Sequence, residues 1–252
     1  NNIADLAHAA VNGHGDFFSV KSPDDLVNGL KSALAAIADR QGAGNAITNS
    51  SNTLPSTSSS TDPFFQFRAT YYTGQWTGTL TASTYDTSTT PPSYAPDWST
   101  NSLSASFSTV KVGGSNVSLS NRNVWTTSNG SGGSGSEAFR QASNLTSAQQ
   151  TGLGAYSVST VDAQTMLNYL LGDSTYAVGN PGGTLRARKA LLGDVVSSTP
   201  VYVATPDAGL YANATFTGAS SYSNFVATEA SRAPMVYVAA NDGMLHAFRV
   251  TA

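Results

Sequence analysis

The feature that most constrains the fold is an alternating stretch near the end of the chain, Ala233-Pro-Met-Val-Tyr-Val-Ala-Ala-Asn-Asp-Gly-Met-Leu-His-Ala-Phe-Arg-Val250. From Val236 to Ala240 the side chains alternate with the period of a β-strand whose two faces both meet protein. Asn241-Asp242-Gly243 then supplies residues that tolerate positive φ, which is a strong signal for a tight turn. Every second residue from Met244 to Val250 falls on one face of the return strand. The stretch therefore predicts a β-hairpin.

A second apolar stretch, Leu191–Ala204, precedes the hairpin and predicts another strand that ends at the turn cluster Pro206-Asp207-Ala208-Gly209. Taken together, Gly193-Asp-Val-Val-Ser-Ser-Thr-Pro-Val-Tyr-Val203 and Arg232–Phe248 closely resemble the opening of the β-propeller domain in the PilC/PilY family of type IV pilus tip-associated adhesins. Quinoprotein-like propellers share a similar pattern of strand, Asn-Asp-Gly and strand. The first unit, at its distance before the second, favours the pilus family.

The N-terminal part carries strong helix signals. We expect a short helix at Ala4–Ala10 and a brief buried strand at His14–Val20. Ser22-Pro23-Asp24-Asp25 combines an N-cap, a proline suited to the first helical position and an acid at the capping-box position. Apolar residues at helical spacing follow, so the helix is expected to run to about Arg40. This order of strand and helix resembles the end of a von Willebrand A-like domain, which many family members carry upstream.

The middle of the chain predicts a linker followed by short strands. Ile47–Asp62 is rich in Ser, Thr and Asn and has almost nothing to bury. Phe64–Tyr72 and Trp76–Tyr85 are expected to form two strands, with their aromatic side chains packing across the pair. A second hairpin is expected within Leu103–Leu119. The strand pair and the signature Asn121-Arg-Asn-Val-Trp125 resemble the family's bridge between the A-like domain and the propeller.

Two further helices are expected in the second half of the chain. Leu145–Leu153 is predicted to start with Ser147 and Gln150 as a capping box. Val161–Leu171 has a clearer apolar face, and in the family such a helix leads into the first propeller strand. Two segments are expected to be loops: Thr87–Pro96 and Tyr211–Thr228.

The predicted fold is mainly β with a few helices, in four parts. These are the C-terminal strand and helix of a von Willebrand A-like domain (1–45), a linker (46–63), a β-rich bridge with short helices (64–190), and the first blade of a PilC/PilY-type β-propeller (191–252). Both ends of the chain fall within or at the edge of an expected element, so we expect an internal piece of a longer protein.

Composition narrows the class of function. Charged residues make up 11% of the 252 residues and the net charge is −3, so the chain has no electrostatic footprint for nucleic acid or anionic membranes. There is no cysteine, hence no disulfide framework or thiolate site. No apolar run reaches the roughly 18 residues that cross a bilayer. This balance is typical of an extracellular, β-rich surface protein.

The sequence offers little chemistry. No Ser/His/Asp set, paired catalytic carboxylates or Asp-x-Asp-x-Asp-Gly calcium loop is present, so we predict neither an enzyme nor a catalytic, metal or cofactor residue in this segment. Some family members bind calcium in a loop that lies later in the propeller, outside residues 1–252. Binding residues cannot be named from the pattern. Asp194 and Asp242 are the two acids of interest, with turn and strand-end hydrogen bonding as their expected role.

Three functions fit the sequence. The resemblance implies an adhesin and biogenesis factor at the tip of a bacterial type IV pilus, outside the cell. It would bind minor pilins and host or abiotic surface ligands, and it would oppose pilus retraction. The alternatives are a fragment of a quinoprotein-like propeller oxidoreductase and a structural component of a surface fibre. The hairpin and its preceding unit favour the first.

Overall fold

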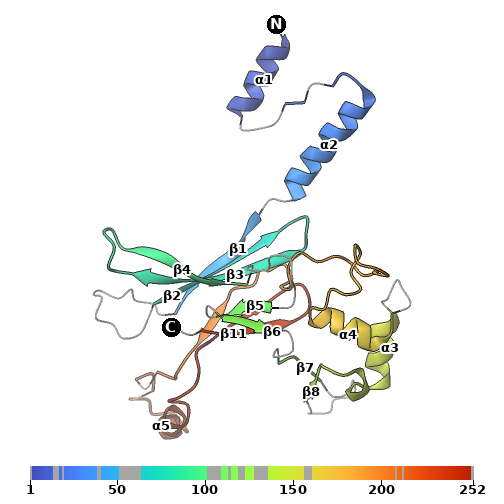
Figure 1. Ribbon diagram of the computed structural model, residues 1–252. Coiled ribbons are helices and arrows are strands. Elements are labelled where there is room, and N and C mark those ends of the chain that lie inside the picture. Colours follow the sequence, from blue (N-terminus) through green and yellow to red (C-terminus); the bar gives the residue numbers. More distant parts are fainter. Residues whose placement is uncertain are drawn as a thin grey trace.

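The computed structural model shows a mainly β protein with two helices projecting from its body (Figure 1). It describes residues 2–13, 17–18, 20–38, 41–50, 64–100, 109–112, 115–118, 123–127, 136–155, 161–207, 209–211 and 213–250. The helices are α1 (Asn2–Asn12), α2 (Pro23–Ala38), the 3-10 helix η2 (Ala142–Asn144), α3 (Ser147–Ala155), α4 (Ala163–Leu171) and α5 (Ala219–Thr228). The strands are β1 (Gln41–Asn49), β2 (Phe65–Tyr72), β3 (Thr77–Asp86), β4 (Ser93–Ser99), β5 (Thr109–Val112), β6 (Ser115–Ser118), β7 (Trp125–Thr127), β8 (Ser136–Ala138), β9 (Val201–Val203), β10 (Met235–Ala239) and β11 (Leu245–Arg249).

The largest sheet is antiparallel, with the strand order β1-β2-β3-β4. On β2, Phe65, Phe67 and Ala69 are buried, because every second side chain of a strand faces the same side. The strand pair predicted on either side of Thr73-Gly74-Gln75 is confirmed. The aromatic residues also pack across strands as expected, for example Phe64 against Tyr85 at 6.1 Å between ring centroids.

The C-terminal hairpin forms as predicted. β10 and β11 are antiparallel and pair Val236 with Phe248 and Val238 with His246. Gly243 closes the turn at φ 82°, a backbone conformation that favours glycine. β9 adds a third strand on the other side of β10.

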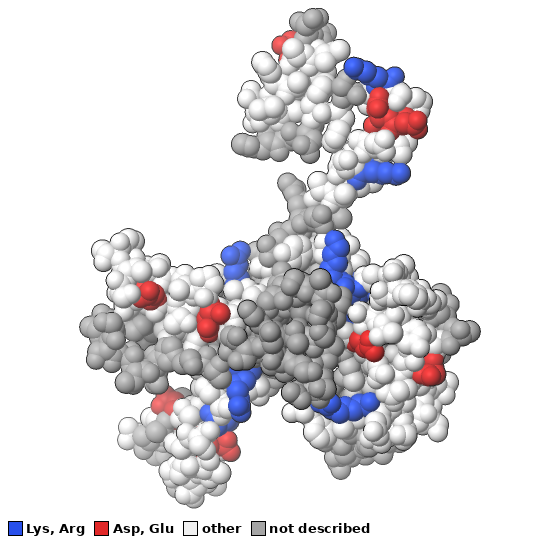
Figure 2. Space-filling model, viewed as in Figure 1, with Lys and Arg blue, Asp and Glu red and all other residues white. Residues whose placement is uncertain are grey.

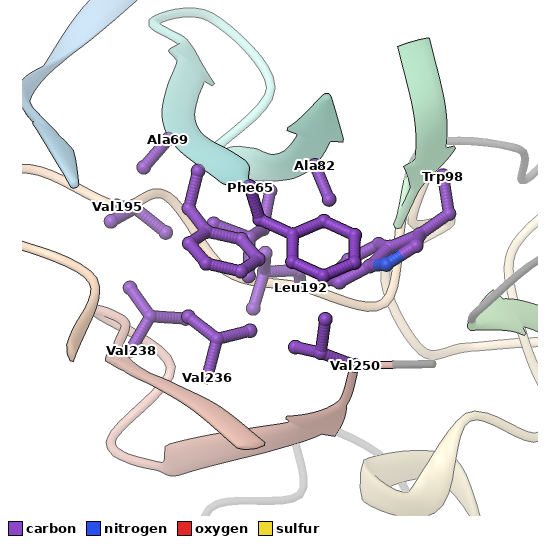
Figure 3. Packing of buried hydrophobic residues seen from close by; sticks show 11 residues of the cluster. Phe65, Ala69, Ala82, Trp98, Leu192, Val195, Val236, Val238 and Val250 are labelled. Atoms are coloured by element: carbon purple, nitrogen blue, oxygen red, sulfur yellow. The ribbon is translucent and has the colours of Figure 1, made fainter. Parts of the chain in front are cut away.

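One hydrophobic core lies between the two sheets. Figure 3 shows side chains of the large sheet pointing toward those of the hairpin, with Leu192 and Val195 between them. Phe67 is fully buried at its centre, with its ring 5.6 Å from that of Tyr202 and 6.4 Å from that of Trp98. The members of the core are Phe65, Phe67, Ala69, Leu80, Ala82, Trp98, Leu192, Val195, Val236, Val238 and Val250.

Local hydrogen bonds explain where the helices begin. At α2, the Asp25 amide donates to Ser22 Oγ at 3.2 Å, so the predicted N-cap is confirmed. At α4, the Thr165 amide donates to the Asp162 carboxylate at 2.7 Å. At α3 the predicted capping box was one residue too late: the amides of Thr146 and Gln149 each donate to the other residue's side chain. Serine is the stronger N-cap residue in general, so the sequence favoured Ser147 over Thr146.

The predicted linker is wrong at its start. Residues 41–49 form strand β1, in which Ile47 pairs with Arg68 and Asn49 pairs with Gln66. Few of its side chains are apolar, but an edge strand can be held by backbone hydrogen bonds that composition does not reveal. A side-chain bond from Thr48 Oγ1 to the Pro200 carbonyl, at 2.6 Å, adds to this pairing. The remainder of the predicted linker, 51–63, lies outside the described residues.

Three other expectations need correction. The strand expected over Leu191–Ala204 is reduced to β9, because the amide and carbonyl groups of 192–194 bond to β3 and to the hairpin turn instead of to one ladder. The expected loop Thr87–Pro96 ends in β4, where Pro96 lies on an edge strand that tolerates proline. The expected loop Tyr211–Thr228 contains helix α5.

The N-terminal helices form where the sequence predicts them, but they project away from the sheets (Figure 1). Their apolar side chains, such as Leu26, Leu30 and Leu34, are exposed. Phe17, Phe18 and Val20 are also exposed and belong to no strand, contrary to the buried strand expected there. The residues 14–16 and 19 of that expected strand lie outside the described part of the chain.

Replacing Phe67 with alanine is expected to lower the free energy of unfolding by about 3–5 kcal/mol, because the change leaves a cavity at the centre of the core. Urea unfolding of the recombinant chain measures this. Leu245→Ala is the control, since Leu245 is 70% exposed and its loss should change stability by less than about 0.5 kcal/mol. Equal effects of the two substitutions would show that the core does not lie between the sheets.

Candidate functional site

The two acids singled out in the sequence lie together. The segment 192–195 meets the hairpin turn, and the Asn241 amide donates to the Asp194 carbonyl at 3.0 Å. The Asn241 side-chain amide donates to Asp194 Oδ2 at 2.9 Å. The Gly193 amide donates to Asp242 Oδ2, also at 2.9 Å. We call this set of contacts the turn latch, made of Gly193, Asp194, Asn241, Asp242 and His246.

Asp242 is the central acceptor of the turn latch. Besides the Gly193 amide, its carboxylate accepts the Met244 amide at 3.0 Å and contacts His246 Nε2 at 2.8 Å. Burial by itself raises the pKa of Asp242. The bond and the charge of His246, together with the amides of Gly193 and Met244, outweigh burial and hold that pKa below its ordinary value. The site therefore favours an ionised Asp242.

His246 was missed as a site residue in the sequence. It sits on β11, is buried, and stacks on Phe248 with an angle of 11° between the rings. Its position four residues after Asp242 could have indicated the contact. In a hairpin with a tight turn, the first inward-facing residues of the return strand lie close to the turn side chains. The strand pattern places His246 on β11, and the turn gives it an acidic partner in Asp242.

The turn latch also joins the hairpin to the large sheet. The Gly78 amide at the start of β3 donates to the Leu192 carbonyl at 2.9 Å, and Thr77 forms an isolated antiparallel bridge with Gly193. Both glycines are required for this close approach. A Cβ on Gly78 would lie 2.3 Å from the Gly193 carbonyl oxygen, and a Cβ on Gly193 would lie 2.8 Å from the Asp242 backbone nitrogen.

The contacts of the turn latch fix the hairpin turn in position, and they bring no complete set of catalytic groups together. An Asp–His pair orients an imidazole, but nucleophilic catalysis also needs a hydroxyl or thiol in reach of that ring, and the described contacts of His246 are Asp242 and Phe248. Among the described residues, no group of three or more His, Cys, Asp and Glu side chains could hold a metal ion. None of the helices that the structure describes has the length and apolar character needed to cross a bilayer.

Strands β9, β10 and β11 form a small antiparallel sheet, and small sheets of this kind are the units of β-propeller blades. Residues 192–252 match the family model described as the PilY1 beta-propeller domain. This match, together with the curated relatives described next, supports the PilY1 family for the chain.

The similarity to curated relatives extends far beyond the propeller segment. The chain is 33% identical to the type IV pilus biogenesis factor PilY1 homolog of Xylella fastidiosa, over 92% of this chain and 16% of that protein. It is 30% identical to type IV pilus biogenesis factor PilY1 of Pseudomonas aeruginosa strain PAK, over 98% of this chain and 21% of the relative. The chain therefore spans about a fifth of these relatives. No solved structure matches it.

Gly78→Ala is expected to lower the free energy of unfolding by about 1–3 kcal/mol, because the new Cβ pushes β3 away from Gly193. Chemical denaturation of the recombinant chain measures the change. Gly152→Ala is a matched control within helix α3, where a Cβ meets nothing within 4 Å. Alanine favours helix over glycine, so this control should be neutral or stabilise by up to about 1 kcal/mol. Equal stability of wild type and Gly78→Ala would disprove the close contact.

The substitution Asp242→Asn is expected to lower the free energy of unfolding by about 1–3 kcal/mol at neutral pH. The donors around Asp242 bond to two carboxylate oxygens, whereas an amide offers a single acceptor oxygen. Folding lowers the pKa of Asp242 below its ordinary value of 3.8. The ionised side chain therefore contributes fully to the free energy of unfolding at pH values above 3.8, and this contribution is lost as the pH falls through the lower pKa of the folded state.

The difference in unfolding free energy between wild type and Asp242→Asn should therefore shrink as pH is lowered from about 5 to about 2. Denaturant titrations at a series of pH values measure it. Asp5→Asn, on the projecting helix α1, removes the same charge away from the latch and serves as the control. A difference that stays constant down to the lowest pH would refute the role given to the Asp242 carboxylate.

Proposed function

We propose that this chain is part of a type IV pilus biogenesis factor. The observation that carries the proposal is its similarity to proteins of that name over almost its whole length, including the parts before the propeller segment. A shared hairpin alone would be compatible with other propellers. Similarity through the bridge as well favours the same kind of whole protein.

The proposed mode of action is binding, outside the cell at the pilus tip. The protein would contact minor pilins and host or abiotic surface ligands, and it would oppose pilus retraction. Two features of the described residues support a binding role. The polar side chains of the turn latch bond to groups within the protein, and the exposed surface includes many large apolar side chains. The relatives are named as type IV pilus biogenesis factors.

We also propose a division of the chain into domains. Residues 1–45 would be the end of a von Willebrand A-like domain, 64–190 a bridge, and 191–252 the start of the propeller. The exposed leucines of α2 support the first assignment, because an amphipathic helix of an α/β domain buries such a stripe against its sheet. Strand β1 crosses the boundary between 1–45 and the proposed linker 46–63, and its pairing with β2 joins it to the bridge sheet.

The test is co-purification of the full-length protein with purified minor pilins, with and without a calcium chelator. Retention of pilins on the immobilised protein is expected. Loss of retention on chelation would indicate a metal-dependent part of the whole protein, since the described residues here form no metal-ligand cluster. Gly152→Ala and Gly78→Ala full-length proteins are compared alongside, and only the latter should lose pilins together with stability. If the folded wild-type protein retains no pilin in either condition, the proposal is wrong.

A further inference from the structure

The connection between β9 and β10 is far longer than the pairing of these strands requires. The two strands are antiparallel neighbours, which a connection of about two to five residues can join. Here residues 204–234 separate them and include helix α5. In Figure 1 this insertion extends away from the sheets at the lower left. Long connections on a rigid scaffold often carry binding function.

The two ends of the insertion are fastened together. The Arg232 side chain, shortly before β10, donates hydrogen bonds from Nε and Nη2 to the carbonyl of Ala204, the first residue after β9. The Tyr222 hydroxyl donates to the Asp207 carbonyl at 3.1 Å. Arg232 also lies over the Phe225 ring, with Cζ 5.9 Å from its centroid. These contacts order the insertion before any partner arrives, which lowers the entropic cost of binding.

The insertion carries one leucine and four aromatic side chains, of which all but the half-buried Tyr222 are exposed. We call this group the aromatic patch: Leu210, Tyr211, Phe216, Tyr222 and Phe225. The Tyr211 ring stands edge-on to Phe216 at 5.3 Å and to Tyr222 at 4.8 Å. Even so, Tyr211 is 39% exposed, Phe216 54%, Phe225 44% and Leu210 59%. The rings support one another, but much of their surface meets water.

The aromatic patch lies in an uncharged segment. No Asp, Glu, Lys or Arg occurs between Asp207 and Glu229, and the residues around the rings are mostly Ser, Thr, Asn, Gly and Ala. Figure 2 shows the corresponding lobe at the lower left as mostly white. Exposed aromatic residues combined with Ser, Gly and Asn are typical of surfaces that bind proteins, whereas Lys, Glu and Asp are depleted there.

We propose that the aromatic patch binds an uncharged, apolar surface of a folded protein and, resting on the function proposed above, that this protein is a minor pilin. The aromatic patch lies in a segment without charged residues. A charged partner surface would therefore lose its hydration against these rings without gaining a counter-ion. Tyr211 packs edge to face against Phe216 and Tyr222, on an insertion that extends away from the sheets (Figure 1). Ordered aromatic side chains in such a position can act as anchors in an apolar pocket of another protein.

The test compares three full-length proteins for binding to purified minor pilins by surface plasmon resonance. The patch variant is Leu210→Ser with Phe216→Ser. The matched control is Val178→Ser with Tyr176→Ser, which removes an aliphatic side chain 59% exposed and an aromatic one 43% exposed from a different loop. Thermal unfolding of each protein confirms that it is folded. At least a tenfold weaker affinity is expected for the patch variant, with no change for the control.

The outcomes separate this inference from the function on which it rests. If wild type and patch variant bind minor pilins equally well, the patch is not the contact surface, while the proposed function stands. If folded wild type binds no pilin, both are overturned. Hydroxyl-radical footprinting of the free full-length protein adds a second readout. Protection of Tyr211 and Phe216 in the free protein would show that the same chain or a second copy covers them, which would overturn the inference.

Discussion

The close contact of Gly78 with Gly193, and of Gly193 with Asp242, is the constraint on which the rest of the structure depends. Three backbone segments from distant parts of the sequence meet at this point: the start of β3, the extended segment 192–195 and the hairpin turn. The hairpin β10–β11 is marginally stable at best in isolation, and its apolar face needs a second layer against which to be buried. The contact fixes how that layer approaches.

Hydrophobic burial and the turn latch have different tasks in this arrangement. Fully burying a large apolar side chain contributes about 1.5–3 kcal/mol, and the core holds several of them, so burial supplies most of the stability. A single internal hydrogen bond contributes only about 1 kcal/mol. The latch bonds are directional, however, whereas apolar contact is not. They select one placement of the hairpin on the large sheet from the many that would bury a similar area.

The polar groups of the turn latch and the exposed apolar side chains lie in different parts of the molecule. Asp242 and His246 satisfy each other and the neighbouring amides, which leaves them a structural role. Apolar side chains remain exposed elsewhere, on α2 and on the insertion that carries α5. The aromatic patch differs from the α2 stripe because its rings are held in place by contacts within the insertion.

The sequence by itself determined the elements whose signals are local: the Asn-Asp-Gly hairpin, helix α2 with its Ser22 cap, helix α4, and the strand pair on either side of Gly74. It also carried the family resemblance. Only the tertiary structure decided that 41–49 is a strand and that 191–200 is largely free of ladder pairing, since both depend on backbone partners distant in the chain. The same holds for the site: Asp194 and Asp242 stood out as turn acids, but folding brought Gly78 and Gly193 into contact there. Hydrophobic periodicity and turn preference depend on neighbouring residues, so the sequence reveals them. The close backbone contact of Gly78 with Gly193 depends on how the two sheets pack, so only the tertiary structure reveals it.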